Sequence, residues 1–194
     1  MDRPFEVYPL TADRWADLED LFGPRGACAG CWCTFFKLGH REFKLFAGEP
    51  ARQMQQNWVK EGFVPGLLAY DGGQAVGWMA IEPREAYPRL ARSRVMRAVD
   101  DQPVWSVTCF YTRKSHRRQG VTVALLRAGV AYARQMGGKI VEGYPTEARS
   151  GSQPAPFVFT GLAGAFAQAG FSEVARFSPN RPIFRISVDP PANQ

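Results

Sequence analysis

Apolar and polar residues alternate along this chain with two periods, that of a helix and that of a strand. Residues 12–22 repeat apolar side chains at helical spacing behind Thr11, which predicts a helix that Thr11 caps. The apolar positions of this helix are Trp15, Leu18, Leu21 and Phe22. Residues 50–62 begin with a proline and end with a glycine, which predicts a second helix.

Strand patterns lie before, between and after these two helices. Residues 5–11 are predicted as a short strand. Residues 66–83 hold two apolar runs about the pair Gly72-Gly73, which is the signal of a β-hairpin. Residues 104–112, rich in β-branched and aromatic side chains, are predicted as the fourth strand.

Basic residues are concentrated directly after that fourth strand. Five of the six residues from Arg113 to Arg118 are basic, and Gly120 then opens a predicted helix. Its expected apolar face comprises Val123, Leu126, Val130 and Ala133. Because the free N–H groups and dipole of a helix N-terminus favour anions, and Arg117 and Arg118 add charge, the junction predicts a phosphate or pyrophosphate site.

The glycine spacing decides which kind of phosphate site this is. Neither the P-loop string G-x-x-x-x-G-K-[ST] nor the dinucleotide string G-x-G-x-x-G occurs in the chain. The string that does occur, Arg117-Arg118-Gln119-Gly120-Val121-Thr122, resembles the Arg/Gln-x-x-Gly-x-Gly/Ala signature of the GNAT acyl-CoA-dependent N-acetyltransferases. Thr122 stands where that signature has Gly or Ala, and its hydroxyl could donate a hydrogen bond to the pyrophosphate.

The remainder of the chain supports the resemblance. A strand is predicted over 139–145, a short helix over 160–171 and two further strands over 172–188. This element order is that of the family, and the resemblance covers residues 4–188. The CAGCWC loop and the VEGYP stretch look like those of a bacterial subgroup of such proteins.

The resemblance implies an α/β fold of the GNAT type. Its central mixed, mostly antiparallel sheet of about seven strands would be flanked by about four helices and splayed between strands 4 and 5. We expect residues 1–188 to form a single domain and residues 189–194 to be a frayed tail.

The resemblance also implies how acetyl-CoA would be held. The main chain of the fourth strand would pair with the pantetheine arm as an added strand, and one of its N–H groups would polarise the thioester carbonyl. The residues are Thr108, Cys109, Phe110 and Tyr111 for the arm, and Arg117, Arg118, Gln119, Gly120, Val121 and Thr122 for the pyrophosphate.

The acid and the base follow less directly. Family members often carry a tyrosine four residues before the Gly-Phe that follows the last helix, and Phe166 stands there. Tyr111 and Tyr144 are substitutes for this acid, and a thiolate also leaves without one because a thiol has a pKa of about 8.5. Candidate bases are Glu142, Glu82 and His116, and Glu142 ranks first. The alternative is that Glu142 only pairs with an arginine.

Three of the four cysteines lie in the CAGCWC loop, as Cys28, Cys31 and Cys33. Cys-x-x-Cys is half of a common zinc site, and His40 follows the loop. A complete site needs a second well-placed pair of ligands, and the fourth cysteine, Cys109, belongs to a distant strand. We therefore expect no bound metal. The alternative is reduced thiols packed beside the aromatic side chains Trp32, Phe35 and Phe36. These aromatics either line an apolar acceptor site or belong to the core.

Composition and charge narrow the class of protein. The 194 residues are 45% hydrophobic and 22% charged, as in an ordinary globular protein, and no apolar run has the length of a membrane span. No export signal is recognisable, which favours the cytoplasm. The net charge of +6 favours anionic partners, but the tightest basic cluster fits one phosphate group better than a nucleic acid. The arginines of residues 84–101 are expected to balance nearby acids at the surface or to attract an acidic acceptor.

The expected function is acetyl transfer from acetyl-CoA to a primary amine of a small molecule or peptide, directly within a ternary complex. The alternatives are an acyl-CoA-binding protein without catalysis and a metal or redox sensor built on the cysteine loop. We expect neither a nucleic-acid nor a membrane partner, and a homodimer is common among proteins of this kind.

Overall fold

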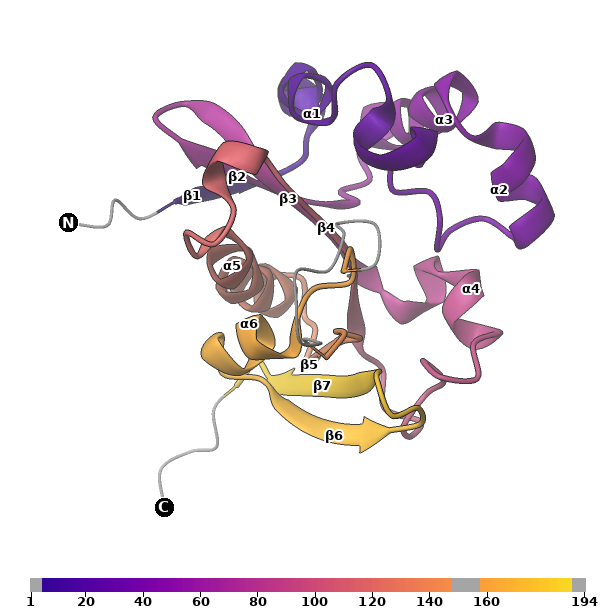
Figure 1. The fold of residues 1–194 in the computed structure, drawn as a ribbon, viewed down its shortest axis with the longest axis vertical. Helices are drawn as coiled ribbons and strands as arrows, with labels where there is room; N and C mark the ends of the chain where they lie inside the picture. The colour runs from indigo at the N-terminus through magenta and orange to yellow at the C-terminus, as the bar shows by residue number, and fades with distance from the viewer. Residues whose placement is uncertain (1–4, 148–157, 190–194) are drawn as a thin grey trace.

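The computed structural model describes residues 5–147 and 158–189, and its strands form one sheet in the order β1-β2-β3-β4-β5-β7-β6 (Figure 1). Neighbouring strands are antiparallel except β4 and β5, which are parallel. The strands are β1 (Glu6–Pro9), β2 (Gly66–Asp71), β3 (Gln74–Pro83), β4 (Trp105–Thr112), β5 (Ile140–Gly143), β6 (Ser172–Arg176) and β7 (Pro182–Ser187). The predicted mixed sheet of about seven strands is confirmed.

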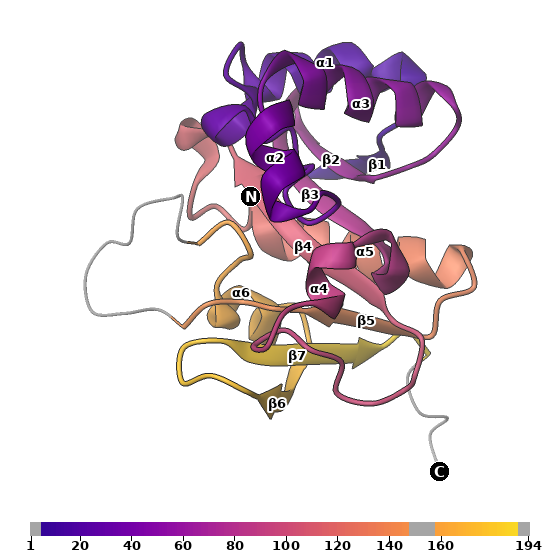
Figure 2. The same ribbon diagram turned by 90° about the vertical axis from the view of Figure 1, so that its right-hand side faces the viewer.

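Helices cover both faces of this sheet, with α5 and α6 on one face and α1 to α4 on the other (Figures 1 and 2). Their bounds are α1 (Trp15–Phe22), α2 (His40–Phe46), α3 (Glu49–Lys60), α4 (Pro88–Ala91), α5 (Val121–Gln135) and α6 (Ala163–Gln168). The four helices predicted from the sequence are α1, α3, α5 and α6, whereas α2 and α4 are additional. No helix in the described ranges is both long and apolar enough to span a bilayer.

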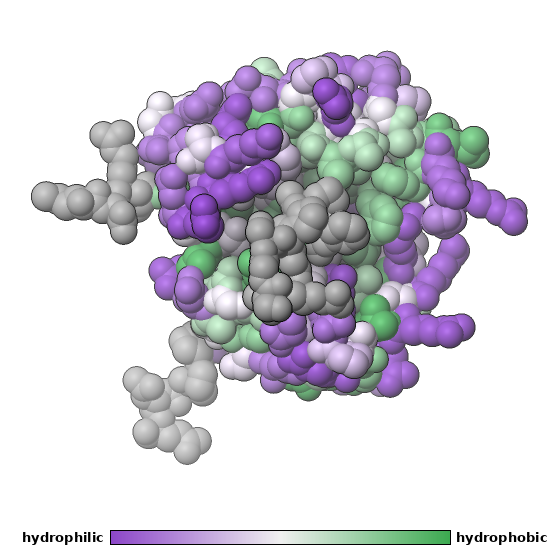
Figure 3. Space-filling view, in the orientation of Figure 1, coloured by the Kyte–Doolittle hydropathy of each residue, from purple (hydrophilic) through white to green (hydrophobic). Residues whose placement is uncertain are grey.

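Hydrophobic surface is visible in the upper right of the face shown in Figure 3, where Figure 1 places α2 and α3. The large exposed apolar side chains include Leu45 and Phe46 of α2 and Phe63, which follows α3. Hydrophilic side chains surround this region (Figure 3).

The β2–β3 hairpin turns on two glycines, as predicted. Gly72 has φ of 55° and Gly73 has φ of 82°, and both values lie in the left-handed region that a tight two-residue hairpin turn requires. The two strands pair from Gly66 with Ala80 to Asp71 with Gln74.

One local expectation was wrong. Thr11 makes no capping bond to the backbone, because its Oγ1 accepts a hydrogen bond from the Arg14 guanidinium at 2.8 Å. The predicted apolar face of α5 packs on the core, with Leu126 and Ala133 buried and with Val123 and Val130 half-buried at its margin. The buried residues of α5 are Val121, Leu125, Leu126, Gly129 and Ala133.

The parallel pairing of β4 with β5 is short. It comprises three residue pairs, from Trp105 with Val141 to Val107 with Gly143. Beyond Val107 the two strands separate, and the carbonyl of Phe159 accepts a hydrogen bond from the Phe110 N–H at 2.6 Å. The predicted splay between the fourth and fifth strands is therefore confirmed.

Close packing of α5 on β3 depends on a glycine. A Cβ atom at Gly77 would lie 2.4 Å from Val121 Cγ1 and 3.2 Å from Leu125 Cδ1. Only hydrogen at this position lets the first turn of α5 approach the sheet, so Gly77 fixes where the helix N-terminus lies relative to β4.

We expect Gly77→Ala to lower the free energy of unfolding by about 1–3 kcal/mol, because overpacking forces neighbouring side chains from their preferred positions. Chemical denaturation would measure this. The matched control is Gly164→Ala in α6, where an added Cβ meets nothing within 4 Å and which we expect to be neutral or slightly stabilising. Equal effects of the two substitutions would contradict the packing argument.

Candidate active site

The N-terminus of α5 presents free backbone donors at the surface. Gly120 precedes the helix with φ of 86°, no side chain caps it, and Ala124 N–H makes the first bond back to the Gly120 carbonyl. The N–H groups of the first turn therefore have no partner within the helix. The side chains of Arg117, Arg118 and Gln119 beside them are exposed. This geometry suits a phosphate group.

The basic loop that leads to α5 is held by polar contacts at its start. The Arg113 guanidinium donates to the Asp20 carboxylate at 2.6 Å and to the Ala75 carbonyl at 3.1 Å. His116 Nε2 lies 3.4 Å from the Asp71 carboxylate, so this candidate base belongs to the loop rather than to the interior. The loop conformation is thus fixed before any ligand arrives.

The edge of β4 beyond Val107 faces the splay. Thr108 is buried, Phe110 is nearly so, and Cys109 and Tyr111 are half-buried. The bond from Phe110 N–H to Phe159 shows that the main chain here can hold a carbonyl oxygen. The structure brings this strand edge and the N-terminus of α5 together along one continuous stretch of chain.

Glu142 lies in β5 where this strand still pairs with β4, and both of its carboxylate oxygens accept hydrogen bonds. The side chain is fully buried. Oε1 accepts hydrogen bonds from Arg84 at 3.1 Å and from the Tyr144 hydroxyl at 2.6 Å, and Oε2 accepts one from Arg185 at 2.6 Å. The alternative for Glu142 was that it only pairs with an arginine. The structure shows this pairing, with two arginines, Arg84 and Arg185.

Tyr144 belongs to the same network. Its hydroxyl is also bonded to Arg84 at 2.6 Å and to Ser106 at 2.8 Å, and its side chain is fully buried. Burial and the nearby Glu142 carboxylate raise the pKa of the Tyr144 hydroxyl far above its usual value. Neither side chain has a free polar position for a substrate, and their predicted catalytic roles find no support in these contacts.

Glu82, at the end of β3, has a different environment. Its residue is 8% exposed, and burial raises the pKa of its carboxyl while Lys37 opposes this. Lys37 Nζ forms an ion pair with Glu82 Oε2 at 2.5 Å. The buried hydroxyl of Tyr87, which interacts with the Glu82 charge, has no hydrogen-bond partner among the residues described. A buried polar atom without a partner is what a site for a polar ligand needs.

The aromatic side chains of the cysteine loop go to two places. Trp32 is buried against Trp15 and Phe22, with ring centroids 6.1 and 5.6 Å away. Phe35 and Phe36 instead pack with Phe159. They do not form one apolar wall, and the core alternative describes Trp32 and Phe36 better.

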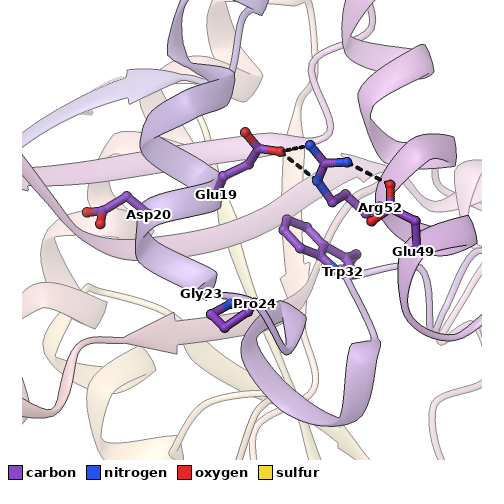
Figure 4. A pocket seen from close by; sticks show the side chains of 7 residues that line it. All are labelled: Glu19, Asp20, Gly23, Pro24, Trp32, Glu49 and Arg52. Atoms are coloured by element: carbon purple, nitrogen blue, oxygen red, sulfur yellow. Dashed lines mark hydrogen bonds and ion pairs between the residues drawn. The ribbon is translucent and has the colours of Figure 1, made fainter.

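A hollow of about 560 Å³ lies above Trp32 between α1 and α3 (Figure 4). Arg52 donates from this hollow to Glu19 at 2.6 Å and to Glu49 at 2.7 Å. Because its guanidinium is shared between two carboxylates, and Asp20 already pairs with Arg113, the hollow offers no free charge among the residues described. We assign it no ligand.

Residues 32–153 match the family model described as "Acetyltransferase (GNAT) family". The chain belongs to the GNAT acetyltransferase family. No curated protein matches the sequence. Solved GNAT structures share the fold, among them an acetyltransferase from Listeria monocytogenes with a TM-score of 0.55, 9% identity, and 94% of each chain covered.

Two further structures extend this likeness. One is described as histone acetyltransferase HPA2 and related acetyltransferase from Corynebacterium glutamicum, with a TM-score of 0.53 and 19% identity over 99% of each chain. The other is the PaiA N-acetyltransferase from Thermoplasma acidophilum in complex with coenzyme A, with a TM-score of 0.53 and 10% identity over 95% of this chain and 99% of that one. These identities show the fold alone.

Phe166 stands at the position where GNAT proteins often have a tyrosine. It is fully buried, and its ring fills the space where Cβ atoms at Gly143 and Gly161 would lie, 2.1 and 2.9 Å from its edge. It also packs against Phe110 with ring centroids 6.0 Å apart. The side chain lies beside the splay but has no proton to donate.

Sequence reasoning missed two members of the site region, Lys37 and Tyr87, and one contact, that of Cys109 with Cys33. Lys37 and Tyr87 approach Glu82 from segments whose pattern carries no signal for this contact. Cys109, expected to be distant from the cysteine loop, has its Sγ atom 3.5 Å from Cys33 Sγ. That expectation was wrong because β4 runs beneath the loop although 76 residues separate the two cysteines.

Glu142→Gln is expected to destabilise the fold by about 3–5 kcal/mol, because Arg84 and Arg185 then lose a buried counter-charge. Thermal and chemical unfolding would measure the loss. The control Glu173→Gln, which removes an exposed partner of Arg176, should cost less than about 1 kcal/mol. Full stability of Glu142→Gln combined with lost turnover would contradict the structural role and restore Glu142 as the base.

Proposed function

We propose that this GNAT protein transfers an acetyl group from acetyl-CoA to a primary amine, directly within a ternary complex. The observation that carries the proposal is the continuity of two features, the edge of β4 that β5 leaves beyond Val107 and the free N-terminus of α5. An extended thiol arm ending in a pyrophosphate is a ligand that needs both features in this order.

The pyrophosphate would lie at the first turn of α5. Backbone N–H groups of Gly120, Val121 and Thr122 would donate to it, while Arg117 and Arg118 add mobile positive charge. The Thr122 side chain is half-exposed at the same turn, so its hydroxyl can reach a phosphate oxygen.

The thioester carbonyl would accept a hydrogen bond from Phe110 N–H. This N–H already donates to the Phe159 carbonyl at 2.6 Å, so the acetyl carbonyl has to replace that oxygen. A backbone donor fixed by the sheet stabilises the negative charge that develops on the carbonyl oxygen during attack. Thr108, Cys109 and Tyr111 would complete the strand edge that pairs with the pantetheine arm.

For the base we propose Glu82 in place of Glu142. Glu82 is buried, its pKa is raised, and Lys37 is its charged partner, whereas the Glu142 carboxylate is bonded to Arg84, Tyr144 and Arg185. A carboxylate with a raised pKa accepts a proton from the attacking ammonium group more readily, directly or through water. The departing thiolate needs no acid in this scheme, since a thiol pKa of about 8.5 makes it a tolerable leaving group.

Thr122→Glu should abolish binding of acetyl-CoA without unfolding the protein. The new carboxylate lies at the first turn of α5, where the helix dipole stabilises a negative charge, so the fold should be kept. The same carboxylate repels the negatively charged pyrophosphate of acetyl-CoA. Isothermal calorimetry should show affinity at least about tenfold below that of the matched control Thr122→Gln, which is equal in size and uncharged. If the two folded variants bind acetyl-CoA with equal affinity, the proposed pyrophosphate site at the N-terminus of α5 is contradicted.

Glu82→Gln should lower kcat/KM by about 10²–10⁴-fold while leaving acetyl-CoA affinity unchanged, because only proton transfer is lost. In the parent protein, kcat/KM should rise with pH through the Glu82 pKa, which lies above the ordinary glutamate value.

The Lys37 ammonium group lowers the pKa of Glu82. Lys37→Met should therefore shift the rise of kcat/KM to higher pH.

Glu85→Gln is the control, since Glu85 is an exposed carboxylate three residues further along the chain and should not alter the rate. Binding of acetyl-CoA without turnover of any amine in a broad screen would instead favour an acyl-CoA-binding protein without catalysis.

A further inference from the structure

The cysteines of this chain converge although the sequence separates them. Cys33 Sγ lies 3.5 Å from Cys109 Sγ, and the Trp78 indole N–H donates to Cys33 Sγ at 3.0 Å. Cys31 lies two residues before Cys33 in the same loop, and its thiol donates to the Gly26 carbonyl at 3.6 Å. A loop between α1 and α2 and the central strand β4 thus bring two free thiols, Cys33 and Cys109, into contact, with a third, Cys31, two residues away along the chain.

The loop that carries two of these thiols has strained backbone. Four non-glycine residues have positive φ there, namely Ala27 at 64°, Ala29 at 49°, Trp32 at 40° and Cys33 at 55°. In the described ranges Arg118 is the only other such residue. Strain of this kind persists where the surrounding packing enforces it, and it is concentrated at functional sites.

The environments of Cys31 and Cys33 shift the pKa values of their thiols in opposite directions. Cys31 is half-buried, and hydrogen bonding from Cys33 lowers its pKa to about 6 against the effect of burial. Cys33 is buried, and its bonds to Cys109 and Cys31, together with burial, raise its pKa well above the usual value. At neutral pH Cys31 is therefore mostly thiolate and Cys33 remains a thiol.

We propose that Cys31, Cys33 and Cys109 form a peroxide-responsive thiol relay whose product is a reversible disulfide between Cys33 and Cys109. The bond requires the two sulfur atoms to approach by about 1.5 Å, from their 3.5 Å contact to the length of a disulfide. Among the residues described, no group of three side chains is arranged to hold a metal ion.

The relay begins at Cys31. Its thiolate attacks hydrogen peroxide, an S–O bond forms, the O–O bond breaks and hydroxide leaves, which gives a sulfenic acid. Cys33 sulfur then attacks Cys31 sulfur, the S–O bond breaks, and the hydroxide leaves as water with the Cys33 proton. The result is a transient disulfide between Cys31 and Cys33.

The final step is thiol–disulfide exchange. Cys109 sulfur attacks Cys33 sulfur, and Cys31 leaves as the thiolate because the thiol of lower pKa is the better leaving group. The Cys109 proton neutralises the hydroxide from the first step. Two thiols and one peroxide have become one disulfide and two waters, and Cys31 is regenerated.

The consequence for the site rests on the proposed function. Cys109 lies between Thr108 and Phe110 on the edge of β4 that we assign to the coenzyme. A bridge would draw β4 toward the cysteine loop and shift the Phe110 N–H. Oxidised protein should therefore bind acetyl-CoA at least about tenfold more weakly than reduced protein, and a thiol reductant should restore binding.

Peptide mapping after treatment with hydrogen peroxide and alkylation of free thiols tests the relay itself. Trypsin releases the loop cysteines in the peptide of residues 26–37 and Cys109 in that of residues 98–113. In wild type these two peptides should be linked and reductant should separate them. Absence of the link, or stable sulfinic acid at Cys31 in its place, would overturn the proposal.

Three serine variants assign the roles. Cys33→Ser should abolish the link, and Cys31→Ser should slow its formation about tenfold or more, because the thiol whose pKa is lowered to about 6 is then lost. Cys28→Ser is the matched control, since Cys28 is exposed in the same loop and should change the rate by less than about twofold. An unchanged rate in Cys31→Ser, or a persistent link in Cys33→Ser, would overturn the relay.

The same samples separate this proposal from the proposed function. If reduced protein does not bind acetyl-CoA, the transferase proposal fails while the disulfide map still reports on the relay. If the link forms and acetyl-CoA affinity does not change, the regulatory consequence is overturned.

Discussion

The early end of the pairing between β4 and β5 is the constraint on which the rest of the site depends. A buried strand that loses its neighbour leaves backbone N–H and carbonyl groups without partners, which is costly unless something else bonds them. After Val107 the structure resolves this by bringing in the chain near Phe159, whose carbonyl accepts from Phe110 N–H. The same edge, which β5 leaves beyond Val107, is where we propose that the extended arm of the coenzyme binds.

The Glu142 network fixes where the strands part. Ser106 of β4 pairs with Glu142 of β5, and the Glu142 carboxylate is bonded to Arg185 of β7 and to Arg84, which follows β3. Charged side chains from three segments thus meet one residue pair before the pairing of β4 with β5 ends. A buried charge network of this kind adds little stability compared with apolar packing, but breaking one member is costly because the others lose their partners. Its contribution is therefore to the position of the splay rather than to overall stability.

Local patterns were sufficient for most of the fold and insufficient for most of the site. The Gly72-Gly73 turn and the helix after Gly120 follow from a few adjacent residues, and both were predicted correctly. The partners of Glu142 and the contact between Cys33 and Cys109 depend on the register of strands and on loop paths. The sequence pattern does not predict helix α2, because the apolar side chains of residues 40–46 are exposed and do not form the stripe that marks a packed helix.

A site built on backbone donors explains why the side-chain departures from the family pattern need not abolish function. The proposed roles of Phe110 and Gly120 use main-chain N–H groups, which depend on the sheet and the helix rather than on particular side chains. Phe166 illustrates the converse: its ring fills the space left by Gly143 and Gly161, so its position serves packing beside the splay. The loss of a tyrosine hydroxyl there removes an acid, but a thiolate is a stable enough leaving group for the reaction to proceed without one. The attacking amine has no such alternative, since it is protonated at neutral pH and must lose that proton before it can attack. The proposed reaction therefore depends more on the base than on the acid, and the buried carboxylate of Glu82, whose pKa is raised, is the side chain to which we assign that role.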